Sequence, residues 1–165
     1  MTFFFHTKQV ILGLLLCSSA LLVTVFYFEY VGGIIPRKLC IWQRLPHAIV
    51  VFLGIFALVN NNYRLVISLA CSLAIFSGFL LSGYHVGIEH KLWPGPQSCS
   101  GTDALNTLSP DLFLETILKT PITKCDEVTW SFLKISMAGW NFIFSFLLTI
   151  IWSQTTLQVF KTSKT

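Results

Sequence analysis

LVISLACSLAIFSGFLLSGYHV, residues 65–86, contains no Lys, Arg, Asp or Glu. An α-helix needs about 20 consecutive apolar residues to cross the hydrocarbon core of a bilayer. Two further uncharged runs of that length occupy residues 9–28 and 135–160, and residues 45–63 form a slightly shorter one. The sequence therefore predicts an all-α membrane protein built as a transmembrane bundle of four helices.

The composition of the whole chain supports the same conclusion. Of its 165 residues, 54% are apolar and 11% are charged, and the mean hydropathy is +0.72. A soluble domain averages about 25% charged residues, so a soluble globule is excluded. We expect a single membrane domain over residues 1–165, with spans near 9–29, 44–62, 65–85 and 136–158 and loops near 30–43 and 86–135.

The sequence argues against several other classes. The first apolar run continues through Phe26, Tyr27 and Phe28 without a small-residue cleavage site, so we interpret it as a retained helix and not as a signal peptide. The formal net charge is +4, but the basic residues are scattered, so nucleic acid is not an expected partner. The uncharged runs also lack the intramembrane charges of a transporter. No metal site is predicted.

The longest polar segment, residues 87–134, holds every acidic residue of the chain except Glu29. Within it, Ser109, Pro110 and Asp111 have the pattern of a helix N-terminus, which predicts a short helix up to Lys119. This helix either lies at the bilayer surface or packs on the bundle. The chain is expected to leave the membrane in this segment.

Two of the five cysteines, Cys99 and Cys125, lie in this polar segment. A disulfide between them would stabilise the loop by roughly 3 to 4 kcal/mol, or it would be an exposed, exchangeable redox bond. Both interpretations place the loop in an oxidising compartment, so both termini are expected in the cytoplasm. Cys17 and Cys71 fall inside predicted spans and are expected to be packing residues.

Cys40 lies just before the second span, four residues ahead of Arg44. If the helix begins a turn earlier than the uncharged run, Arg44 projects beside Cys40 and its charge favours the reactive thiolate. The alternative is an interfacial cysteine next to an arginine that anchors the helix at the membrane surface.

Several motifs, in order along the chain, resemble the DsbB family of bacterial inner-membrane proteins, which use quinone to reoxidise the periplasmic thiol oxidase DsbA. The resemblance implies a four-helix bundle, a periplasmic loop with a redox disulfide, and a quinone bound near the start of the second helix. The motifs are LCIWQRLPH (39–47), YHVGIE (84–89), WPGP (93–96), CDEV (125–128) and SMAGWN (136–141).

The resemblance also implies roles for the cysteines. Cys99 is similar to the family cysteine that forms a mixed disulfide with the DsbA-like partner, and Cys125 is similar to its pair. Cys40 corresponds to the second cysteine of the family's Cys-x-x-Cys motif, whose thiolate meets the quinone. The first cysteine of that motif is replaced here by Arg37.

The quinone site implied by the resemblance comprises Arg44, which would hold and polarise the quinone, together with Trp42 and His47. The quinone is expected to be ubiquinone or menaquinone. His85 and Glu89 lie in one of the shared motifs, and no role beyond anchoring at the membrane interface is assigned to them.

The replacement at Arg37 leaves two hypotheses for function. In the first, the protein is a multi-pass inner-membrane oxidoreductase that reoxidises a periplasmic DsbA-like thiol oxidase and passes electrons to quinone. Cys40 would then pair with Cys125 or Cys99, unless one electron-transfer step is lost. In the second, it is an impaired or non-catalytic membrane protein that binds a periplasmic thioredoxin-like partner.

Overall fold

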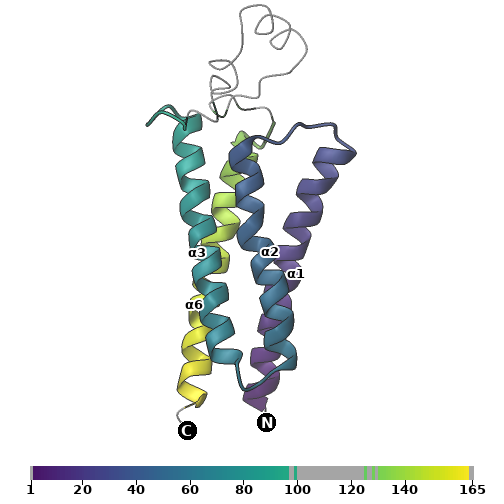
Figure 1. The fold of residues 1–165 in the computed structure, drawn as a ribbon, viewed down its shortest axis with the longest axis vertical. Coiled ribbons are helices and arrows are strands. Elements are labelled where there is room, and N and C mark those ends of the chain that lie inside the picture. Colours follow the sequence, from purple (N-terminus) through teal and green to yellow (C-terminus); the bar gives the residue numbers. More distant parts are fainter. Residues whose placement is uncertain (1, 97–98, 100–124, 126–127, 129, 164–165) are drawn as a thin grey trace, which may run out of the picture.

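The computed structural model describes residues 2–96, 99, 125, 128 and 130–163 (Figure 1). Four long helices pack side by side as a bundle, which confirms the predicted fold class. They are α1 (Thr2–Tyr30), α2 (Lys38–Val59), α3 (Arg64–Glu89) and α6 (Met137–Ser163). The predicted short helix over residues 112–119 lies outside the described residues.

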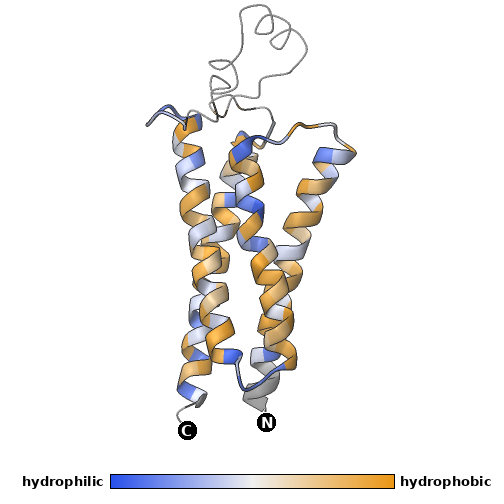
Figure 2. Cartoon of the chain, viewed as in Figure 1, coloured by the Kyte–Doolittle hydropathy of each residue, from blue (hydrophilic) through white to orange (hydrophobic). Residues whose placement is uncertain are grey.

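Each of the four helices is long and apolar enough to cross a membrane. The candidate spans are 22 to 26 residues long, with mean hydropathies between 1.4 and 2.4. Apolar residues cover most of the bundle's length, and polar residues gather toward its two ends (Figure 2). Both termini lie at one end of the bundle (Figure 1), and Cys99 and Cys125 lie at the other, packed with Leu39 at the start of α2 and Ile88 near the end of α3.

Helix α2 begins at Lys38, earlier than the uncharged run indicated. Pro46 therefore lies inside the helix. A Cβ at Gly78 of α3 would lie only 3.1 Å from the Cβ of Pro46, so the glycine allows the two helices to approach closely at the proline. The helix therefore includes Lys38 and Arg44, which the uncharged run left out.

The main apolar core lies in the half of the bundle nearest the two termini. Its best-buried members come from all four helices and include Ile11, Val50, Ile75 and Trp152. Hydrogen bonds between hydroxyl groups also join α3 and α6, such as the 2.8 Å contact of Ser68 Oγ with Thr156 Oγ1. Such bonds contribute modestly, about 0.6 kcal/mol each on average, to the association of membrane helices.

A two-stranded hairpin, which the sequence did not predict, precedes α6. Strand β1 (Ser131–Phe132) pairs antiparallel with β2 (Ile135–Ser136). The two turn residues, Leu133 and Lys134, have φ values of 52° and 64°, as a tight turn between twisted strands requires. The hairpin holds Trp130 and Phe132 over the end of the bundle, where both residues line a cavity.

Candidate functional site

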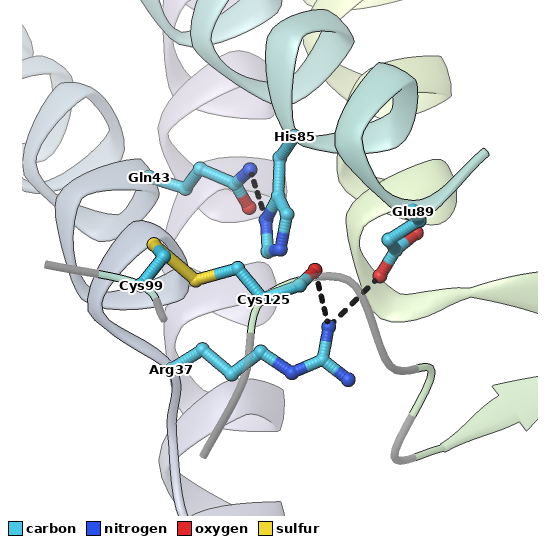
Figure 3. The surroundings of a disulfide bond; sticks show 6 residues. All are labelled: Arg37, Gln43, His85, Glu89, Cys99 and Cys125. Carbon is cyan, nitrogen blue, oxygen red and sulfur yellow. Dashed lines mark hydrogen bonds and ion pairs between the residues drawn. A yellow bond between two sulfur atoms is a disulfide. The ribbon is translucent and has the colours of Figure 1, made fainter. Parts of the chain in front are cut away.

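Cys99 and Cys125 form a disulfide with a Cα–Cα distance of 5.2 Å (Figure 3). The two residues are only 4% and 1% exposed, and they pack with Leu39 of α2 and Ile88 of α3. Of the two interpretations of this bond, the one that expected it to be exposed was therefore wrong on that point. The disulfide packs against the adjacent ends of α2 and α3, and this packing shields it from solvent.

Arg37 fastens the disulfide to the bundle. Its Nη1 donates to the main-chain oxygen of Cys125 at 3.2 Å and to Glu89 Oε1 at 3.2 Å (Figure 3). The Arg37 and Glu89 side chains are 3% and 6% exposed, so this is a buried ion pair. Ser136 Oγ donates to the other carboxylate oxygen of Glu89 at 2.5 Å. The first residues of α2, the end of α3, the hairpin and the disulfide are thereby joined.

A cavity of about 380 Å³ lies between α1, α2, α6 and the hairpin. Three of the predicted site residues, Cys40, Arg44 and His47, line it. Trp42 does not line this cavity and is 61% exposed on another face of α2. The other lining residues are mostly apolar or aromatic: Leu21, Leu22, Thr24, Val25, Phe28, Gln43, Trp130, Phe132, Met137, Trp140, Asn141 and Phe144.

The contacts of Arg37 with Glu89 and with the main chain of Cys125 form a clamp around the disulfide. Cys40 lies between this clamp and the cavity. It is a free, partly buried cysteine. A second cavity of about 30 Å³ is lined by Cys40, Arg37, Arg44 and Glu89, among others. Cys40 therefore has access to both sides: the aromatic cavity within the bundle, and the charged residues that hold Cys125.

Arg44 points toward α1. Its Nη1 donates to Glu29 Oε2 at 2.5 Å, and its guanidinium lies 4.9 Å from the centre of the Phe26 ring. The sequence had predicted a charge directed at Cys40, whereas the structure shares that charge with a carboxylate on α1.

A row of polar groups crosses the bundle beside the cavity. Gln43 Nε2 contacts His85 Nδ1 at 3.1 Å, and Asn141 Nδ2 donates to Gln43 Oε1 at 3.3 Å. Asn141 Oδ1 in turn lies 3.1 Å from His47 Nε2. Gln43 and Asn141 were not predicted as site residues from the sequence, and His85 had no specific predicted role. Polar side chains in otherwise apolar spans were the available signal, because such residues mark functional sites in membranes.

The wall of the larger cavity fits a flat diketone such as a quinone. Arg44 Nε and His47 Nδ1 are buried and have no hydrogen-bond partner among the described residues. Both belong to residues that line the cavity, where carbonyl oxygens of a ligand could meet them. Aromatic rings of Phe28, Trp130 and Trp140 supply flat apolar surface, and the volume is in the usual range for ligand sites.

A membrane bundle that carries a disulfide at one end, beside a cavity with a free cysteine in its wall, defines a class of integral membrane thiol–disulfide proteins. The chain belongs to the DsbB family: the family model for disulfide bond formation protein DsbB matches residues 7–154. Members of this family are quinone-dependent thiol oxidoreductases of the bacterial inner membrane.

Curated relatives agree with this assignment. The chain is 32% identical to disulfide bond formation protein B of Pasteurella multocida, over 83% of this chain and 79% of the relative. It is 31% identical to the protein of the same name from Haemophilus influenzae strain 86-028NP, over 97% of this chain and 93% of the relative. It is 28% identical to disulfide bond formation protein B of Acinetobacter baumannii, over 94% of this chain and 96% of the relative. No solved structure gives a significant match.

Proposed function

We propose that this protein reoxidises a periplasmic DsbA-like thiol oxidase and passes the electrons to ubiquinone or menaquinone in the inner membrane. One observation carries the proposal: Cys40 lies in the wall of the aromatic cavity and also beside the clamp that holds Cys125. The proposal places the disulfide end of the bundle on the periplasmic side of the membrane and both termini in the cytoplasm.

The loop disulfide performs the first exchange. A thiolate of the partner attacks Cys99 Sγ, and Cys125 leaves as a thiolate; the second thiolate of the partner then displaces Cys99. The partner is oxidised by two electrons, and the loop now holds two thiols. We assign the attack to Cys99 because Arg37 fixes the main chain at Cys125.

Cys40 performs the second exchange. A quinone held by Arg44, His47 and the aromatic wall would supply the oxidant, an acceptor of two electrons and two protons. Cys40 supplies the electrons as its sulfur becomes bonded to Cys125, and Cys99 then attacks Cys125 Sγ and releases Cys40 as a thiolate. The loop disulfide is restored, and its two thiols have lost two electrons and two protons. Cys125 is the favoured interloop partner because Arg37, three residues before Cys40, holds its carbonyl oxygen.

A second candidate is a non-catalytic membrane protein that binds a periplasmic thioredoxin-like partner. The burial of the disulfide and its clamp by Arg37 favour this alternative, because both features would also suit a purely structural bond. The two candidates differ in whether a partner thiol exchanges with Cys99.

We expect the variant Cys125→Ala to form a stable mixed disulfide with a DsbA-like protein. The partner retains only its first active-site cysteine, activated with thionitrobenzoate, so attack by the Cys99 thiolate joins the two proteins and releases the coloured thiol. Absorbance and a non-reducing gel measure the reaction. The matched variant Cys99→Ala should react at least about tenfold more slowly, because Cys125 is held in the clamp. Equal, slow reaction of both variants would support the non-catalytic alternative.

The proposed orientation predicts which face of the membrane exposes each cysteine. In a variant with Cys17, Cys40 and Cys71 replaced by Ala, an impermeant thiol reagent should label Cys99 and Cys125 from the periplasmic side once the disulfide is reduced. A cysteine introduced by Lys161→Cys, near the C-terminal end of α6, should react only after the inner membrane is opened. The reverse pattern would overturn the orientation.

A further inference from the structure

We propose that His47 exchanges a proton with the quinone through its Nδ1 atom, and that the row of amides leading to His85 fixes the imidazole in the tautomer that makes this possible. The inference rests on the proposed function, because it concerns the same cavity. It adds a proton-carrying group to the electron-carrying Cys40.

The direction of each hydrogen bond follows from the amides, since an amide oxygen only accepts and an amide nitrogen only donates. Asn141 Nδ2 donates to Gln43 Oε1. Gln43 Nε2 must therefore donate to His85 Nδ1, its contact at 3.1 Å (Figure 3). At the other end, Asn141 Oδ1 must accept from His47 Nε2, at 3.1 Å. All three bonds point the same way, from His47 toward His85.

One tautomer of His47 is compatible with this row. The Nε2 atom carries the hydrogen, so Nδ1 of the neutral ring has a lone pair. Nδ1 is buried and has no hydrogen-bond partner among the described residues. Protonation at Nδ1 leaves the bond from Nε2 to Asn141 in place, so the ring can gain and lose this proton without turning.

The surroundings make His47 the suitable group for this exchange. It is the only imidazole among the described residues that line the cavity. On its own helix Cys40 and Arg44 also line the cavity, and Arg44 is paired with Glu29 of α1. Helix α6 contributes the uncharged Asn141 and Ser145, and α3 contributes His85 only through Gln43.

The proton balance is complete. Protonated Nδ1 gives its proton to a quinone oxygen while electrons arrive through Cys40, and the ring returns to the neutral tautomer. Re-forming the loop disulfide releases two protons from the two thiols: one supplies the second proton of the quinone and the other restores the proton on Nδ1, so uptake and release are equal. Arg44 Nε, which always carries a hydrogen, donates to an oxygen without exchanging it.

The decisive variant is His47→Gln. Its amide nitrogen can still donate to Asn141, but it cannot exchange a proton. We expect the rate of ubiquinone-1 reduction by the reduced partner to fall about 100-fold, the usual range for loss of a general acid. The parent rate should decline as pH rises through the pKa of His47, because the protonated ring is required, and the rate of the variant should not follow this titration. His90→Gln, at an exposed position after α3, is the matched control and should behave as the parent.

Two measurements do not depend on activity. Binding of ubiquinone-1, followed by quenching of tryptophan fluorescence, should change less than about threefold in His47→Gln, because Arg44 and the aromatic wall remain. In protein labelled with ¹⁵N-histidine, His47 should show a protonated Nε2 and an unprotonated Nδ1 at alkaline pH. Asn141→Leu should allow the other tautomer to appear.

The outcomes separate the two proposals. If the parent neither binds nor reduces ubiquinone-1, the proposed function fails and this inference fails with it. If the parent reduces ubiquinone-1 and His47→Gln does so at the same rate and with the same pH profile, only the role of His47 is refuted. A neutral His47 protonated at Nδ1 would also refute it.

Discussion

Replacing Cys40 with alanine is expected to lower quinone reduction by at least about 1,000-fold, as loss of a reacting nucleophile does in other enzymes. Cys40 is the only cysteine in the wall of the aromatic cavity among the described residues, so no other described sulfur can take its place. The measurement is the absorbance change of ubiquinone-1 in the presence of the reduced partner. The Cys99–Cys125 disulfide should persist in the variant, since its packing involves Leu39 and Ile88.

Cys17→Ala is the matched control for this experiment. Cys17 is a partly buried thiol of α1 that packs against the main apolar core and does not line the cavity. The control should retain the rate of the parent within about twofold. If Cys40→Ala also retained that rate, electrons would have to leave the loop thiols without Cys40, and the assigned site would be wrong.

Breaking the ion pair between Arg37 and Glu89 should have the largest effect on stability. Removing one partner leaves the other charge buried, which typically costs 3 to 5 kcal/mol, so we expect Arg37→Gln to lose about 3 kcal/mol. It should also speed reduction of the disulfide by dithiothreitol, because Cys125 loses its main-chain anchor. Thermal unfolding in detergent and the kinetics of thiol release measure the two effects.

The double variant Arg37→Gln with Glu89→Gln tests the origin of the loss. Removing both charges should restore much of the stability, since neither charge is then left unpaired, but the disulfide should stay easier to reduce. If the double variant lost as much stability as the two single variants together, the two charges would not be coupled.

Restoring the family cysteine by Arg37→Cys should raise quinone turnover only when Glu89→Gln accompanies it, because the single change leaves the Glu89 carboxylate buried without a partner charge.

Hydropathy was sufficient to predict the four-helix bundle, but it misplaced helix ends at the disulfide side. An uncharged run ends at the first charged residue, whereas a helix ends where its backbone or side chains find other partners. Glu89 remains helical because Arg37 neutralises it, and Arg44 remains helical because Glu29 does the same. Such pairs join residues far apart in the chain, so no local pattern reveals them.

Helical spacing explains which members of the candidate site lie together. Cys40, Arg44 and His47 are separated by four and three residues and therefore share one face of α2. Trp42 is two residues from Cys40 and lies on another face, outside the cavity. The disulfide was expected to be exposed because its loop is polar, but burial depends on the helix ends that it contacts, which hydropathy alone does not describe.

Arg37 donates a hydrogen bond to the carbonyl oxygen of Cys125, a main-chain atom that every amino acid possesses. This hydrogen bond therefore depends on the position of the backbone at Cys125 and not on the side chain there. A change in neighbouring side chains leaves this acceptor atom in the chain. A hydrogen bond to the main chain tolerates sequence change beside it, which would let the same bundle acquire new protein partners over evolution and offers an engineer a site for grafting.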